Sequence, residues 1–170
     1  HAFFTSIDLS TITGQSTLED IHNLPVSLYT MAVSPSGSNE WSVPVKINTT
    51  EKTIKYYDAI ENGDSVSVAY VAADSDGYVL DDISQYENDF DEETLKSFNT
   101  VNKLYMQDIK YDTTNDEIVI EERVQITGDE YVSANPTFVW AEYNNDRNLL
   151  LFYKCNGKYA YQNISAVMAQ

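Results

Sequence analysis

Acidic side chains gather around one glycine turn near the middle of the sequence. The run Asp74-Ser75-Asp76-Gly77 is followed by Asp81-Asp82. Carboxylate oxygens at alternate positions around a glycine turn are ligands of the kind that Ca²⁺ takes, although the EF-hand register would also need acids at Ala72 and Ile83. We therefore take Asp74, Asp76 and Asp81 as candidate ligands of another type of calcium loop. The alternative is a solvated hairpin turn without a metal, and no other cofactor is expected.

A second set of candidates is aromatic. The chain has 13 Tyr, 6 Phe and 2 Trp, and most rings in alternating strands should pack in the core. A tyrosine near a turn is amphipathic and can instead stack on a sugar or contact a protein. Five tyrosines near turns are the candidate ligand-binding residues: Tyr56, Tyr57, Tyr78, Tyr86 and Tyr143. For each of them, packing at the rim of the core is the alternative.

Activated catalytic groups are scarce. The sequence has two His, two Arg and one Cys, and it lacks the Gly-x-Ser-x-Gly pattern of a nucleophile elbow. Cys155 lies between Lys154 and Asn156 with no His nearby, which indicates an inert thiol. Glycosidase chemistry needs two facing carboxylates, and 27 acidic residues single out no pair. These counts favour a binding module over an enzyme.

Charge and composition exclude several classes of function. Lys and Arg total 10 against 27 Asp and Glu, which gives a net charge of −17 and argues against nucleic-acid binding. A single cysteine excludes an intramolecular disulfide and a Cys-built zinc site. No apolar run approaches 18 residues, so membrane insertion is not expected. An acidic, Asn- and Tyr-rich chain with almost no Cys is typical of exported bacterial proteins, which predicts an extracellular or cell-surface location.

The hydrophobic pattern predicts an all-β protein. Polar and apolar residues alternate over 41–47, 65–71 and 117–126, which indicates half-buried strands. Residues 149–153 form a continuous apolar run that predicts a strand buried on both faces. Asn62-Gly63 and Asn156-Gly157 are hairpin signals. Only 17–24 and 91–98 have helical spacing with capping residues, so two short helices are expected.

Similar blocks recur along the chain in the same order. Residues 3–10 match 78–85, residues 27–31 match 103–106, and residues 43–48 match 122–127. Offsets that drift from block to block are typical of repeated β units with loops of different length. We expect a single β-rich domain over 1–170, or a piece of a larger one. Its units are a partial one at about 3–50, a full one at 53–127 and a partial one at 131–165.

The repeat resembles a blade of a secreted β-propeller. Residues 135–140, 148–153 and 157–165 are similar to three inner strands of such a blade. Residues 28–45 look like an outer hairpin with an Asp-box turn, in which Ser34 and Trp41 match. Ser36 stands where the motif has Asp, Gly37 is one position early and Glu40 replaces Thr. Residues 110–118, the second copy, retain neither Ser nor Trp at the matching positions.

The resemblance implies antiparallel propeller-like blades, about two repeat units in all, with a two-sheet β-sandwich as the alternative. A propeller closes a ring of four to eight blades, so self-association or membership of a longer chain is expected. Sialidases share the propeller and the Asp-box, and they hold the substrate carboxylate with three arginines. This chain has two, Arg123 and Arg147, so a complete sialidase site is not expected.

His1 raises one further possibility. An N-terminal histidine with a second histidine resembles the copper-binding brace of lytic polysaccharide monooxygenases, and His22 is the only other histidine. No motif of that family surrounds either residue, and a surface histidine is the alternative.

These features together predict a noncatalytic extracellular recognition module that binds carbohydrate or a cell-surface protein. The alternatives are a fragment or accessory part of a secreted glycoside-active enzyme and a structural scaffold repeat.

Overall fold

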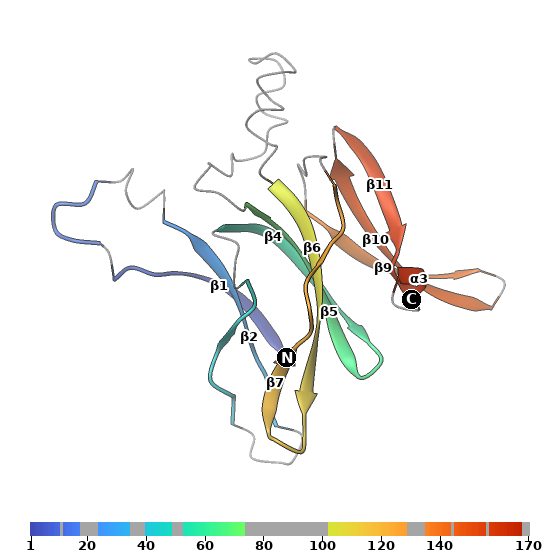
Figure 1. Cartoon of the computed structure of the whole chain (residues 1–170), viewed down its shortest axis with the longest axis horizontal. Helices are drawn as coiled ribbons and strands as arrows, with labels where there is room; N and C mark the ends of the chain where they lie inside the picture. Colours follow the sequence, from blue (N-terminus) through green and yellow to red (C-terminus); the bar gives the residue numbers. More distant parts are fainter. Residues whose placement is uncertain are drawn as a thin grey trace.

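In the part of the chain that the computed structural model describes, the regular elements are antiparallel β-strands and one helical turn (Figure 1). The structure describes residues 1–10, 12–17, 24–34, 40–48, 53–73, 102–128, 135–143, 145–155 and 157–167. The all-β fold class is confirmed. The two expected helices fall on residues outside these ranges, apart from Thr17 and Leu24, which are not helical. Within the ranges, one helical turn that the sequence pattern did not predict, α3 (Ile164–Val167), follows the last strand.

The strands form three sheets. The first sheet contains β1 (Ala2–Ile7), β2 (Val26–Met31) and β3 (Val45–Lys46) in that order. The central sheet has the order β4 (Thr53–Asn62), β5 (Ser65–Ala73), β6 (Asn102–Asp112) and β7 (Glu117–Ile120), with β8 (Val124–Gln125) also paired to β6. The third sheet places β10 (Asp146–Cys155) between β9 (Thr137–Tyr143) and β11 (Lys158–Asn163).

The central sheet lies between the first and the third, and each of these covers one of its faces (Figure 1). Three sheets rather than two mean that the two-sheet sandwich is wrong. None of the three sheets closes on itself within the described ranges.

The central sheet is buried on both faces. One face packs on Leu28 and Ile47 of the first sheet and carries Val68, Tyr70, Ala72, Tyr105 and Ile109. The other face packs on the third sheet and on α3, and it carries Ala69, Val71, Leu104 and Met106. The alternation over 65–71 therefore did not mean a half-buried strand. Ser67 is fully buried because its Oγ donates a hydrogen bond of 2.7 Å to Asp108 Oδ1, which satisfies the hydroxyl away from water.

The third sheet is buried on one face only. Leu149 and Leu151 of β10 are buried against the central sheet, whereas Leu150 is half-buried and Phe152 is 39% exposed. The expectation that 149–153 is buried on both faces is therefore wrong. Successive side chains of a strand point to opposite faces, and among the described elements nothing covers the second face of β10 as the first sheet covers β5.

The first and central sheets make the same backbone contacts at matching positions. Tyr29 pairs with Lys46 and Thr30 with Val45, while Tyr105 pairs with Gln125 and Met106 with Val124. Ile47 N–H donates to Leu28 O, and Ile126 N–H donates to Leu104 O, both at 2.8 Å. Each of these leucines in turn donates its N–H to a buried side-chain oxygen: Asn48 Oδ1 at 2.7 Å for Leu28 and Thr127 Oγ1 at 3.1 Å for Leu104.

The strand beside β2 is equivalent to β5. Phe4 pairs with Tyr29 in the first sheet, and Tyr70 pairs with Tyr105 in the central sheet. Ring centroids in these two pairs are 5.6 Å and 5.8 Å apart. The sequence comparison instead aligned 3–10 with 78–85, which lie outside the described residues. In the structure β1 pairs with β2 as β5 pairs with β6, so β1 corresponds in position to β5.

Two predicted strands are interrupted at matching places. In 41–47, Trp41 forms an isolated bridge to Val33, and the regular strand resumes only at Val45. Pro44 lacks the N–H that a ladder needs, and Ser42 Oγ accepts the N–H of Ala32 at 3.1 Å. In 117–126, the ladder stops at Ile120 and resumes at Val124.

The outer hairpins of the first and central sheets are joined by a carboxylate. Ser34, the residue that matched the Asp-box, donates its hydroxyl to Asp116 Oδ1 at 2.8 Å, and Tyr111 donates its phenol to the same oxygen at 2.7 Å. These two hydrogen bonds lower the pKa of Asp116, the one from Tyr111 having the larger effect. Asp116 has a φ of 56°, a conformation uncommon for residues other than Gly, Asn and Asp.

Candidate ligand-binding cleft

Two hairpins with tight turns, one from the central sheet and one from the third, lie next to each other. The β4–β5 hairpin turns through Gly63, whose φ is 64°, and the β9–β10 hairpin turns through Asn145, whose φ is 66°. Gly and Asn adopt this left-handed conformation at low cost, which allows two-residue turns. Short tips of this kind fix the side chains that flank them.

Two hydrogen bonds hold β9 against β4. The Phe138 N–H donates to Asp58 Oδ2 at 2.8 Å, and the Trp140 indole Nε1–H donates to the Glu61 carbonyl at 3.3 Å. The indole therefore spans from the third sheet to the end of β4. Its ring also packs on the core between the two sheets, where it is half-buried.

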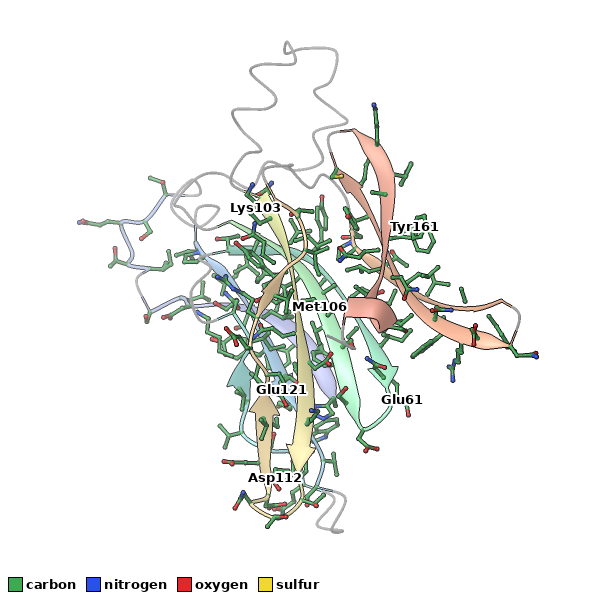
Figure 2. The ribbon with its side chains drawn as sticks, turned by 45° about the vertical axis from the view of Figure 1, so that its right-hand side comes forward. Glu61, Lys103, Met106, Asp112, Glu121 and Tyr161 are labelled. Atoms are coloured by element: carbon green, nitrogen blue, oxygen red, sulfur yellow. The ribbon has the colours of Figure 1, made fainter. Side chains whose placement is uncertain are left out.

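A cleft of about 470 Å³ lies between the two tips and is lined by Ile60, Glu61, Gly63, Trp140 and Arg147. The guanidinium carbon of Arg147 sits 4.2 Å from the centroid of the Trp140 ring, in a cation–π contact. Glu61 lies on the opposite tip, at the end of the β4–β5 hairpin (Figure 2). The cleft thus combines an aromatic ring, a cation and backbone groups.

Arg147 is positioned by the ladder but is not neutralised by it. Glu142 is its direct cross-strand partner, yet among the described residues no carboxylate lies within ion-pair distance of the Arg147 guanidinium. The stacked guanidinium keeps its planar fork of N–H donors available for oxygen atoms of a ligand. The other arginine, Arg123, stacks at 4.2 Å on Tyr105 of the central sheet, and Arg123 is not among the residues that line the cleft.

The candidate tyrosines are not gathered at this cleft. Tyr56 and Tyr57 are successive residues of β4 and point to opposite faces: Tyr56 packs on the core beside the third sheet, and Tyr57 on the core beside the first. The Tyr57 hydroxyl donates to the Phe3 carbonyl at 3.4 Å. Tyr143 is the last residue of β9, at the hairpin tip, and its side chain is not described. Tyr78 and Tyr86 lie outside the described residues.

The candidate metal ligands are not placed. Asp74, Asp76 and Asp81 lie outside the described residues, as does His22. The part of the chain that the structure describes contains no group of three His, Cys, Asp or Glu able to hold a metal ion. His1 lies on the first sheet, where its Nδ1 is 3.4 Å from Thr30 Oγ1 and its ring stacks on Phe3 at 6.2 Å.

A second hollow of about 340 Å³ lies beside the break between β7 and β8. Lys110 and Glu121 line it and form an ion pair of 2.9 Å. The hydrogen bond to Glu121 and the charge of that residue raise the pKa of Lys110. This hollow contains no aromatic side chain and its lysine is already paired, so the first cleft is the better ligand site.

Sequence reasoning missed Trp140 and Arg147 because they are seven residues apart and match no motif. The signal that could have found them is the Asn144-Asn145 pair, which is a turn signal between two apolar segments. A two-residue turn there places Arg147 on the same face as Trp140.

Comparison with models of protein families, with curated proteins and with solved structures gives no match to this chain. Among the described residues, no helix is long and apolar enough to cross a membrane.

Proposed function

We propose that the chain is a noncatalytic extracellular recognition module that binds carbohydrate in the cleft between the two hairpin tips. The observation that carries this proposal is the Trp140–Arg147 stack. A planar cation supported by an aromatic ring presents several N–H donors at fixed positions. Such groups suit the closely spaced hydroxyl oxygens of a sugar, and a few placed polar groups beside an apolar wall are typical of ligand sites.

Charge favours a neutral sugar over an acidic one. Glu61 lines the cleft with Arg147, and Glu142 lies opposite Arg147 in the ladder. The whole chain carries −17, which repels anions at long range. Sugar hydroxyls can accept hydrogen bonds from the guanidinium without carrying a charge of their own, so a neutral sugar avoids this repulsion.

The repeated contacts of the first and central sheets support a propeller-like arrangement of β units. The matching ladder pairs and the matching leucine hydrogen bonds are what two copies of one unit would produce. In this proposal the third sheet is a further unit, and the cleft lies between neighbouring units at their hairpin tips. Binding at loops presented by a rigid β scaffold is a common arrangement.

Binding is best measured through Trp140 itself. The chain has two tryptophans, and Trp41 is 54% exposed on the first sheet. A Trp41→Phe background leaves Trp140 as the sole indole, so its fluorescence reports events in the cleft. We expect a panel of neutral plant, microbial and host glycans to include one that changes this signal in a saturable way, with and without calcium.

Two arginine variants provide a matched comparison. Arg147→Ala should weaken binding by about tenfold or more, because it removes the charged donor from the cleft. Arg123→Ala removes the other ring-stacked arginine from a different sheet and should leave the affinity unchanged. Equal affinity in Arg147→Ala and the parent would overturn the site, and release of reducing ends by the chain alone would overturn the noncatalytic assignment.

A further inference from the structure

Among the described elements, nothing covers one apolar face of the third sheet. Its members alternate with the buried residues of the same strands, and we call them the third-sheet outer face: Val139, Leu150, Phe152, Tyr159 and Tyr161. Tyr161 is 65% exposed and projects from β11 away from the central sheet (Figure 2). Its ring lies 5.6 Å from that of Phe152, its ladder partner. These rings form one continuous surface across the strands.

The first sheet has an outer face of its own, made of Phe4, Tyr29 and Met31. Leu28 and Phe3 pack towards the central sheet, so their neighbours Tyr29 and Phe4 point the other way. Phe4 and Tyr29 stack at an interplanar angle of 14°, and both are half-buried. We call these three residues the first-sheet outer face.

Each outer face corresponds to a face that is buried inside the molecule. The pair Phe4–Tyr29 has the place of the pair Tyr70–Tyr105, which the first sheet covers. When the β9–β10 and β4–β5 hairpins are aligned at their turns, Leu150 of β10 matches Ala69 of β5, and Phe152 matches Val71. The third sheet covers Ala69 and Val71. The two outer faces are therefore the two halves of the kind of interface that already joins neighbouring sheets in this chain.

The charges on the two outer faces also favour contact between them. The ladder positions of the first-sheet outer face hold no Asp or Glu, and neither do those of the third-sheet outer face from Asn148 to Lys154 on β10. The nearest acid on that side of β10 is Asp146, at the hairpin tip. In a chain with 27 acidic residues, faces without carboxylates are suited to close contact with protein.

We infer that copies of this chain associate head to tail, with the third-sheet outer face of one copy packed on the first-sheet outer face of the next. The contact is heterologous, because two different surfaces meet, and repetition of it produces a closed ring or a filament. Aromatic residues dominate both faces, as they do at the energetic centres of interfaces.

The test uses one variant for each face. Phe152→Lys blocks the third-sheet outer face, and Tyr29→Lys blocks the first-sheet outer face. Sedimentation velocity over a wide range of concentrations should show association of the parent chain and at least about tenfold weaker association of each variant alone. A mixture of the two variants should form a dimer, because each retains the face that the other lacks.

Controls separate this arrangement from its competitors. Val43 is 82% exposed and belongs to neither face, so Val43→Lys should associate like the parent. Circular dichroism checks that each variant is folded, and Phe152→Ser and Phe4→Ser replace any variant that is not. A parent chain that stays monomeric overturns the inference. So does a Tyr29→Lys chain that still dimerises by itself, since that would mean two third sheets packed on each other.

Discussion

The strand pairs β5–β6 and β10–β11 have corresponding ladders but different environments. Tyr70 pairs with Tyr105 in the first, and Leu151 pairs with Gln162 in the second. The first pair is buried on both faces, whereas the second exposes Phe152, Tyr159 and Tyr161. Strand alternation therefore determines which residues share a face. Whether that face meets water depends on the neighbouring sheet.

The largest difference in the free energy of unfolding should appear when equivalent residues of these two strand pairs are truncated. Leu104 is fully buried in the central sheet, and Tyr161 has the equivalent place on the exposed face of the third. Leu104→Ala should lower the free energy of unfolding by about 2–5 kcal/mol, because it leaves a cavity between packed sheets. Tyr161→Ala should change it by less than about 0.5 kcal/mol. Urea denaturation at low protein concentration measures both, and equal losses would contradict the comparison.

The next effect concerns the hydrogen bond that the first and central sheets share. Asn48→Ala leaves the buried Leu28 N–H without its acceptor, and Thr127→Val does the same to Leu104. Each should lower the free energy of unfolding by about 1–3 kcal/mol, the range for an unsatisfied buried donor. Thr137→Val, an exposed position of β9, is the control and should have little effect. A loss in one sheet without the other would show that the two units are not equivalent in stability.

A smaller effect distinguishes tyrosine hydroxyls on the two kinds of face. The Tyr70 hydroxyl donates to Gln107 Oε1 at 2.8 Å inside the protein. Tyr70→Phe should lower the free energy of unfolding by about 1 kcal/mol, since it removes one buried hydrogen bond without making a cavity. Tyr161→Phe, on the exposed face, should change nothing measurable. Thermal unfolding of the two variants side by side tests this, and equal melting temperatures would be inconsistent with it.

The smallest effect is the pH dependence of the link between the outer hairpins. The lowered pKa of Asp116 means that its hydrogen bonds stabilise the fold above the ordinary Asp pKa and are lost as the pH falls through the folded value. Asp116→Asn should therefore be less stable than the parent at neutral pH, with the gap closing in acid. Asp64→Asn, at the exposed β4–β5 tip, is the control. A gap that persists unchanged at low pH would contradict a role for the charge.

Local features of the fold were predictable from the sequence. Period-two alternation located β5 and β7, and Asn62-Gly63 and Asn156-Gly157 located two hairpins that the structure contains. The all-β class followed from these. Strand pairing between distant segments did not follow, because alternation is the same in any β segment. For this reason the sequence pattern matched residues 3–10 with 78–85, whereas in the structure β1 pairs with β2 as β5 pairs with β6.

The candidate site was less predictable. A tyrosine beside a turn can face a ligand or the core, and Tyr56 and Tyr57 point into two different cores. Their direction depends on the irregular pairing between Ile54 and Tyr56, which shifts the alternation of β4 and leaves no mark in the pattern. The Trp140–Arg147 stack depends on a second sheet to form its opposite wall, and no local pattern of β9 or β10 contains that information.

The pairing of β5 with β6 sets the order in which the molecule can be assembled. Residues 74–101 separate these strands, whereas two-residue turns join β4 to β5 and β9 to β10. Hairpins close in microseconds, while strands that are distant in the sequence must first overcome a larger entropy of closure. We therefore expect the most buried ladder to be completed late in folding. That entropy grows only with the logarithm of loop length, about 0.6 kcal/mol for each doubling, so this connection is where evolution could lengthen the chain at little thermodynamic cost.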